Sequence, residues 1–311
     1  MSLLKGAKIA VRECMNVKPN EKVLIITDKK MDKSIPLAIY RESLEITDNV
    51  DIKIIKTPKH DGEEPNKKIA NLMKKYDVIF IPTSKSLTHT KAVRNASKKA
   101  RIASMPNITK FSLETGAMTA DYNKVNRLCK IMLRHVKKAK NVRITSRNGT
   151  DLELEVGKYR WFEDNGIYHN PGVGNLPAGE VFTAPNEGKA NGILIIDKYG
   201  EYGDNIKITI EDGYAVEIHG SEKLEKEINK LGKKARNIAE LGIGTNPKAK
   251  VIGNVLEDEK VYGTVHIALG NNKFAGGRVN IPFHVDGIIL KPTLQVGRKI
   301  LIKNGKWLIK K

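Results

Sequence analysis

The segment NEKVLIITD, residues 20–28, decides the fold of the first part of the chain. Its centre, Val23-Leu24-Ile25-Ile26, is a continuous apolar run, which is typical of a strand that a parallel sheet buries on both faces. Asp28 ends the run, and a helical pattern follows over about residues 34–46. The segment therefore predicts the first strand of a βαβ unit.

The same alternation of strands and helices continues to about residue 110. Further strands are expected over residues 52–55, 78–81 and 101–104, with helices between them over about residues 65–75 and 90–99. Such alternation indicates a mainly parallel sheet. The glycine patterns of the common nucleotide-binding loops do not occur here, so we assign no nucleotide to this part.

Hairpins replace this rhythm after a long helix that is expected over about residues 120–139. The turns Asn148-Gly149, Asp212-Gly213 and Asn304-Gly305 each join two β-prone runs, which is the strongest short hairpin signal. One further helix is expected over about residues 221–239. We therefore predict an α/β protein with a mainly parallel βαβ domain, residues 1–139. A β-rich α+β metal-binding domain, residues 140–311, follows it.

The composition limits the partners of this chain of 311 residues. Its net charge is +20, but the lysines are spread along the whole chain, and neither a zinc-finger spacing nor a basic arm occurs. We therefore expect a solvated surface and no specific nucleic-acid partner. No apolar stretch reaches the ~18 residues of a membrane span, and the N-terminus lacks the apolar region of a signal peptide. These features predict a cytoplasmic protein without a membrane partner, and abundant Lys and Ile resemble a heat-adapted composition.

The loop of residues 175–188 has the character of a functional site. Pro177 and Gly179 fix its approach, and Glu180 opens a short apolar run. A carboxylate at the mouth of a buried strand is costly to desolvate unless a cation or a donor compensates it. Taken alone, Glu180 is more simply a surface residue beside a turn, so the other acidic and histidine segments decide the question.

Four later segments carry the groups that could complete such a site. Glu240 is expected where a helix ends in a glycine-rich turn, Glu259 belongs to an Asp-Glu step, and His266 precedes an Ala-Leu-Gly sequence. His284 and Asp286 are two apart, so in a strand they face the same side. Each of these groups alone is more simply a structural or surface residue. Together, carboxylates and two imidazoles are the ligand set of a hydrolytic site for one or two divalent metal ions.

These segments together resemble the thermophilic metallo-aminopeptidases of the aminopeptidase T type. The resemblance rests on five separated segments in the same order along the chain: residues 175–185, the Glu240 turn, the Asp258-Glu259 step, residues 266–270 and residues 284–286. It implies two divalent ions (Co²⁺, Zn²⁺, Mn²⁺ or Mg²⁺) held by six ligands: Glu180, Glu240, Glu259, His266, His284 and Asp286. It also implies a peptide substrate and a homodimer.

The activity that the resemblance implies is removal of N-terminal residues from peptides by a water molecule that two metal ions activate. Glu240 would take the proton of this water and pass it to the leaving amine. The family has a catalytic tyrosine shortly after the Ala-Leu-Gly histidine, but here residues 271–274 read Asn-Asn-Lys-Phe. We therefore expect Lys273, or backbone amides near Gly276-Gly277, to stabilise the oxyanion.

Two alternatives remain open at this point. A related branch, which resembles 2,5-dihydroxypyridine dioxygenases, uses the same scaffold with one Fe²⁺ held by two histidines and an aspartate. The presence of both Glu180 and Glu240 favours the hydrolytic two-metal form. The other alternative is a metal-binding protein of this fold without peptidase activity, which would bind metal without turnover.

Overall fold

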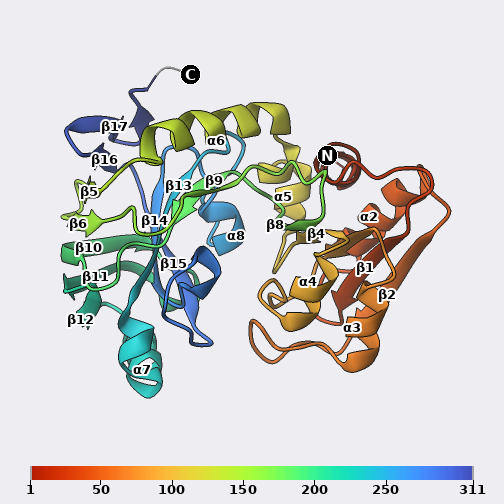
Figure 1. The fold of residues 1–311 in the computed structure, drawn as a ribbon, viewed down its shortest axis with the longest axis horizontal. Coiled ribbons are helices and arrows are strands. Elements are labelled where there is room, and N and C mark those ends of the chain that lie inside the picture. The colour runs from red at the N-terminus through yellow and green to blue at the C-terminus, as the bar shows by residue number, and fades with distance from the viewer. Residues whose placement is uncertain (1, 310–311) are drawn as a thin grey trace. The chain divides into compact units, whose positions relative to one another are not determined.

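The computed structural model describes residues 2–309 and confirms a mixed α/β fold with two separate sheets (Figure 1). The chain divides into two compact units. Unit 1 consists of Met1–Asn126, Asp164–Ala178 and Pro247–Lys250, and unit 2 consists of Arg127–Glu163, Gly179–Asn246 and Val251–Lys311. This division differs from the expected single boundary near residue 140, because the chain returns to unit 1 twice.

Unit 1 contains a parallel sheet of five strands. Their order is β2 (Val50–Ile55), β1 (Val23–Asp28), β3 (Val78–Ile81), β4 (Arg101–Ser104) and β8 (Gly172–Asn175). Each neighbouring pair is parallel, as the alternation of strands and helices predicts. Strand β8 comes from the returning segment, which the sequence patterns did not place in this sheet.

The helices of unit 1 connect these strands. They are α1 (Leu4–Lys8), α2 (Ser34–Leu44), α3 (Lys67–Met73), α4 (Lys91–Ala96) and α5 (Lys110–Glu114), and a π-helix over Ile9–Cys14 continues α1. Asn66, Thr90 and Thr109 begin α3, α4 and α5, and each side chain accepts a hydrogen bond from a backbone amide of the first turn. Such caps satisfy amides that the helix itself leaves unpaired.

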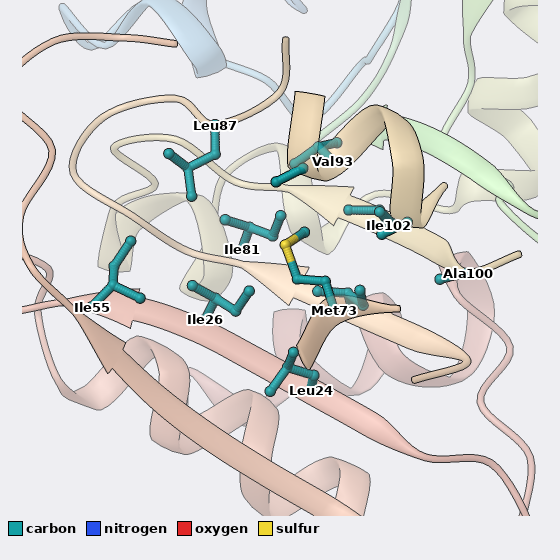
Figure 2. Close-up of a cluster of buried hydrophobic side chains, with 12 residues drawn as sticks. Leu24, Ile26, Ile55, Met73, Ile81, Leu87, Val93, Ala100 and Ile102 are labelled. Carbon is teal, nitrogen blue, oxygen red and sulfur yellow. The ribbon is translucent and has the colours of Figure 1, made fainter. Parts of the chain in front are cut away.

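One hydrophobic cluster of unit 1 lies between one face of this sheet and the helices α3 and α4 (Figure 2). Leu24 and Ile26 point to the same face of β1 because they are two residues apart, and Ile81 of β3 joins them. Met73 and Val93 pack against them from the helices. Burying a side chain of this kind stabilises the fold by about 1.5–3 kcal/mol.

Unit 2 is built on a sheet of thirteen strands. Its main path runs β18 (Lys306–Trp307), β17 (Lys299–Lys303), β16 (Thr293–Val296), β5 (Asn141–Thr145), β6 (Asp151–Glu155), β10 (Ala190–Lys198), β15 (His284–Ile289), β14 (Val265–Gly270), β13 (Ile238–Gly244), β9 (Glu180–Thr183) and β7 (Phe162–Asp164). Strand β11 (Asp204–Glu211) pairs with β10 and with β12 (Tyr214–His219). The three expected hairpin turns join β5 to β6, β11 to β12 and β17 to β18.

Two longer helices and one short helix accompany this sheet. Helix α6 (Tyr122–Val136) precedes β5, and α8 (Val255–Asp258) lies between β13 and β14. Helix α7 (Glu222–Leu231) begins at Ser221, whose side chain accepts a hydrogen bond from the amide of Leu224. Among residues 2–309, no helix is both long and apolar enough to cross a membrane.

The prediction of a helix over residues 221–239 is wrong in its second half. The prediction that Glu240 lies at the end of that helix is wrong for the same reason. Helix α7 stops at Leu231 because Gly232 adopts a positive φ of 79°, a common helix terminator. Residues 238–244 form strand β13, and all of them are buried. Glu240 therefore lies inside a central strand. Its apolar neighbour Leu241 points to the opposite face, and the pairing with β14 is irregular just before Glu240.

Candidate metal centre

The candidate ligands gather on one face of the central strands of unit 2. Ala268 of β14 pairs with Glu240 of β13 on one side and with Asp286 of β15 on the other. Paired residues share a face of the sheet, so a single small side chain separates the two carboxylates. The strands themselves thus bring together two groups that are far apart in the sequence.

Gly242 makes room for the first imidazole. It pairs with His266 of β14 and with Phe182 of β9. A Cβ atom added at Gly242 would lie 1.9 Å from Nε2 of His266, so the ring occupies the space that any other side chain would need. A glycine in a strand often marks such a close approach. Gly242 is therefore required by the close approach of His266, and the glycine-rich sequence after Glu240 forms a strand and not a turn.

Glu240 lies between the two histidines. Its Oε1 is 3.6 Å from Nε2 of His266, and its Oε2 is 3.4 Å from Nε2 of His284. Glu180 Oε2 is 3.1 Å from Nε2 of His266, and Asp286 Oδ2 is 3.4 Å from Nε2 of His284. Each histidine therefore faces Glu240 and one further carboxylate.

Three groups of side chains offer ligand atoms that all lie within 4.8 Å of one another. These groups are Glu180–Glu240–His266, Glu240–His284–Asp286 and Glu259–His266–Asp286. The structure thus brings together all six residues that the sequence analysis selected. Glu259, which directly follows α8, belongs only to the third group.

Lys260 is a buried residue of this centre that the sequence analysis missed. Its Nζ is 2.5 Å from Glu180 Oε1 and 2.6 Å from Glu259 Oε1, and its side chain is fully buried. A buried ammonium group is stable only when anionic partners compensate its lost hydration. The signal in the sequence was a lysine directly after the Asp-Glu step, but one lysine is inconspicuous in a chain with 55 Lys and Arg residues.

Several polar atoms of this centre are buried without a hydrogen-bond partner among the described residues. They are Glu180 Oε2, both ring nitrogens of His266 and Asp286 Oδ1. An unpaired buried polar atom costs about 1–3 kcal/mol. Glu180 Oε2 and His266 Nε2 lie 3.1 Å apart, and each belongs to a residue of the first ligand group, so a cation beside them would accept their lone pairs and the residues present fit a metal ion.

His284 is oriented by the backbone. Its Nδ1 lies 2.8 Å from the carbonyl oxygen of Asn271. A carbonyl oxygen can only accept, so Nδ1 donates the hydrogen, and in the neutral ring Nε2 keeps its lone pair. Nε2 is the atom that faces Glu240 and Asp286. A hydrogen bond from the other ring nitrogen is the usual support of a metal-binding histidine.

The charged groups shift the pKa of both imidazoles upward. Burial by itself lowers the pKa of His266, but Glu180 and Glu240 raise it well above its ordinary value. Burial acts in the same way on His284, and Asp286 and Glu240 raise its pKa well above that value. A metal ion that binds these rings has to compete with protons, because only a ring nitrogen with a free lone pair is a ligand.

The carboxyl groups respond to burial and to the cations around them. Burial raises the pKa of Glu180, but Lys260 and His266 outweigh it, so the pKa is lowered. Asp286, beside His284, has its pKa lowered to about 2 despite burial. In Glu259 burial prevails over Lys260 and raises the pKa to about 8.

Known proteins resemble this chain both in sequence and in fold. A curated 2,5-dihydroxypyridine 5,6-dioxygenase from Pseudomonas putida is 28% identical over 174 residues, which is 49% of either chain. The aminopeptidase PepS from Streptococcus thermophilus is 28% identical over 197 residues, or 52% of this chain and 47% of PepS. The alignments thus span about half of the length of these relatives.

Two solved structures share the fold along nearly the whole chain. The 2,5-dihydroxypyridine dioxygenase from Pseudomonas putida KT2440 has a TM-score of 0.82 at 19% identity, with 100% of this chain and 99% of that one covered. Wild-type AmpT from Thermus thermophilus has a TM-score of 0.69 at 18% identity, with 99% of both chains covered. Both branches that the sequence resembles are thereby confirmed as relatives.

A match to a family model shows to which family this chain belongs. The family described as 2,5-dihydroxypyridine 5,6-dioxygenase, NicX, matches residues 7–309. Because this match covers almost the entire chain, the protein belongs to the NicX family, whose distant relatives include aminopeptidases.

Proposed function

We propose that this protein is an aminopeptidase that depends on two divalent metal ions. The observation that carries the proposal is the position of Glu240, which directs one carboxylate oxygen toward each of the two histidines. Glu180, Glu240 and His266 form one set of ligands, and Glu240, His284 and Asp286 form the other. A carboxylate shared by two ligand sets would suit a site that holds two divalent ions.

The chemistry at such a site depends on both the ions and the chain. When bound, two divalent ions lower the pKa of a water molecule toward neutrality and polarise the scissile carbonyl. Glu240 is also the proposed base, which would take the proton of that water and pass it to the leaving amine. Lys260 holds Glu180 through Oε1, which leaves Oε2 directed at His266. Glu259 bonds to the same ammonium group and is the sixth proposed ligand.

The proposed substrate is a peptide with a free N-terminus. Its α-amine would pair with a carboxylate of the centre, and this pairing would restrict cleavage to the first peptide bond. We also propose that the protein is a homodimer, because the family resemblance implies one. A measurement of the mass of the protein in solution tests this oligomeric state.

Peptide hydrolysis tests the proposal directly. Short peptides with a free and with an acetylated N-terminus are compared for the wild type and Glu240→Gln, with Co²⁺, Zn²⁺ or Mn²⁺ added. We expect the wild type to cleave only the free peptides and the variant to lose ~10²–10⁴-fold in kcat, the usual loss when a general base is removed. If the wild type cleaves neither peptide with any metal, it is not an aminopeptidase. Equal cleavage of both peptides contradicts exopeptidase action, and a fully active variant removes Glu240 from the mechanism.

A second candidate function is ring cleavage by a dioxygenase with one Fe²⁺. The family match favours it, and His266, His284 and Asp286 supply the two histidines and one carboxylate that such iron sites use. We rank it second because an oxygenase needs open coordination positions. Here Glu180 and Glu240 lie near the same imidazole nitrogens and would take these positions.

Elemental analysis of the purified protein separates the two candidates. The peptidase predicts about two divalent ions per chain, whereas the dioxygenase predicts one iron per chain and oxygen consumption with 2,5-dihydroxypyridine. Metal binding with neither activity would leave a metal-binding protein of this fold.

A further inference from the structure

Three phenylalanine rings form a continuous row that ends at the candidate metal centre. We call Phe162, Phe182 and Phe274 the aromatic wall. The ring centroids of Phe162 and Phe182 are 5.3 Å apart in a stacked arrangement, and those of Phe182 and Phe274 are 6.1 Å apart. Phe274 meets the imidazole of His284 edge to face, with centroids 5.0 Å apart. The wall therefore touches a proposed metal ligand.

The sheet places the aromatic wall on the same face as the ligands. Phe182 follows Glu180 by two residues on β9, so both side chains point to one face. It also pairs with Gly242, the residue that lies beneath His266. Phe162 comes from β7, which pairs with β9, and Phe274 comes from the short helix Lys273–Ala275. Three separate segments thus contribute one ring each.

The segment that carries Phe274 is held in place by Glu187. Its Oε1 accepts hydrogen bonds from Asn272 Nδ2 at 3.1 Å and from the backbone amide of Arg278 at 2.8 Å. The hydroxyl of Tyr159 donates to the same carboxylate, at 2.7 Å from Oε2. Residues on both sides of Phe274 therefore bond to the same carboxylate, which holds this segment in place.

The centre is most accessible beside the aromatic wall. The side chains of His266 and Lys260 are fully buried, and that of Glu240 is 6% exposed. Exposure rises to 12% at Asp286 and 22% at His284, and the three rings of the wall are all half-buried. Their partial exposure next to the most accessible ligand leaves apolar surface for a substrate group.

We infer that the aromatic wall forms the side-chain subsite of the centre and selects peptides whose first residue is aromatic or large and apolar. The inference rests on the proposed function, because it assumes that the peptide amine and carbonyl lie at the metal ions. The side chain of the first residue then lies against Phe274 and Phe182. These rings offer stacking and apolar contact to such a side chain. The guanidinium of Arg160 lies 4.2 Å from the centroid of the Phe162 ring, so part of that ring is already covered by a cation.

Binding of two amino-acid hydroxamates to the metal-loaded protein tests the inference without catalysis. L-Phenylalanine hydroxamate and glycine hydroxamate share the metal-binding group and the amine, and they differ only in the side chain. Isothermal titration calorimetry should show about 10- to 100-fold tighter binding of the phenylalanine compound by the wild type, as expected for burial of one such side chain.

Three variants locate the source of this preference. Phe182→Ala and Phe274→Ala should bring the ratio of the two affinities close to one, and Phe274→Leu should keep most of it because it retains apolar volume. Phe111→Ala is the matched control, since Phe111 lies on α5 in unit 1 and should leave the ratio unchanged. The melting temperature of each variant shows whether it is folded. If a variant fails to fold, the ratio of the two affinities in the wild type still tests the inference.

The possible outcomes separate this inference from the function on which it rests. If the wild type binds both hydroxamates with equal affinity, the proposed side-chain subsite is wrong, although the proposed metal centre is not affected. If the protein takes up no metal and binds neither compound, the proposed function itself fails. Tighter binding of 2,5-dihydroxypyridine than of L-phenylalanine hydroxamate also overturns the inference, because the wall would then receive a free ring and not a peptide side chain.

Discussion

Strands β1 and β13 are equally buried but differ in what they bury. All residues of β1 are buried, and its neighbours supply isoleucine, leucine and methionine side chains. All residues of β13 are buried as well, but one face of it carries Glu240 among further carboxylates and two imidazoles. Burial therefore has opposite consequences in the two units. In β1 it stabilises the fold, whereas in β13 it costs free energy that only compensating charges can offset.

A substitution that creates a cavity in unit 1 should have the largest effect on stability. Ile79→Ala removes a fully buried side chain from the core of the parallel sheet, and we expect a loss of about 2–5 kcal/mol. Urea unfolding measures it. Ile54→Ala is the control, because Ile54 is 63% exposed on β2 and should change stability by less than about 0.5 kcal/mol. Equal losses in both variants would show that burial in unit 1 is not what holds it together.

Metal binding should stabilise unit 2, because the ion would compensate the buried charges of the candidate ligands. At a free metal concentration of 100 times Kd, the free energy of unfolding should rise by about 2.7 kcal/mol. Asp286→Ala or His284→Ala should lose this gain and at least one bound ion by elemental analysis. Asp204→Ala, whose side chain is half-exposed on β11, should retain both. Undiminished metal content in both ligand variants would show that the site lies elsewhere.

A smaller effect is expected at Glu187, which holds the segment of Phe274. Burial raises its pKa, but hydrogen bonds from Lys158, Tyr159 and the Arg278 amide outweigh this and lower the pKa to about 2. A pKa lower in the folded than in the unfolded state gives stability that is present above about pH 4.5. That stability is lost as the pH falls toward 2.

Thermal unfolding at several values between pH 5 and pH 3 checks this prediction. Glu187→Gln should be less stable than the wild type at pH 5, and the difference should shrink as the pH falls. Glu222→Gln, at a side chain 88% exposed, is the control and should follow the wild type. A constant difference across this range would mean that Glu187 acts through its shape and not through its charge.

The weakest effect concerns the net charge of +20, which both units share. We expect only weak nucleic-acid association without sequence preference, and it should vanish near physiological ionic strength. Titration of a labelled oligonucleotide at increasing salt measures this. Nanomolar binding to a defined sequence at that salt would overturn our reading of the surface.

The comparison of the two units also shows what a sequence can reveal. The strands of the parallel sheet and the three hairpin turns were predictable, because each depends on a pattern within a few residues. The ligand residues were selected from their chemistry and their family resemblance. The strand at Glu240 was not predicted, because the helical pattern before it was extended past Gly232.

Features that depend on pairing between distant segments could not be read from local patterns. Lys260 belongs to the site because Glu180 and Glu259 both pair with it. Nothing in the sequence distinguishes this lysine from the many others, so its role could not be predicted. The aromatic wall combines rings from three segments in the same way. The approach of His266 to Gly242 likewise follows from the register of β13 and β14.

The late arrival of strand β8 has a consequence for how the protein is made. Strand β8 pairs with β4, but the whole of α6 and the first strands of unit 2 are synthesised between them. A ribosome adds about 5–20 residues per second, so the nascent chain waits several seconds with one edge of β4 unpaired. An unpaired edge is a template for wrong pairing. Until β8 is made, this edge of the parallel sheet is therefore exposed to pairing with another chain.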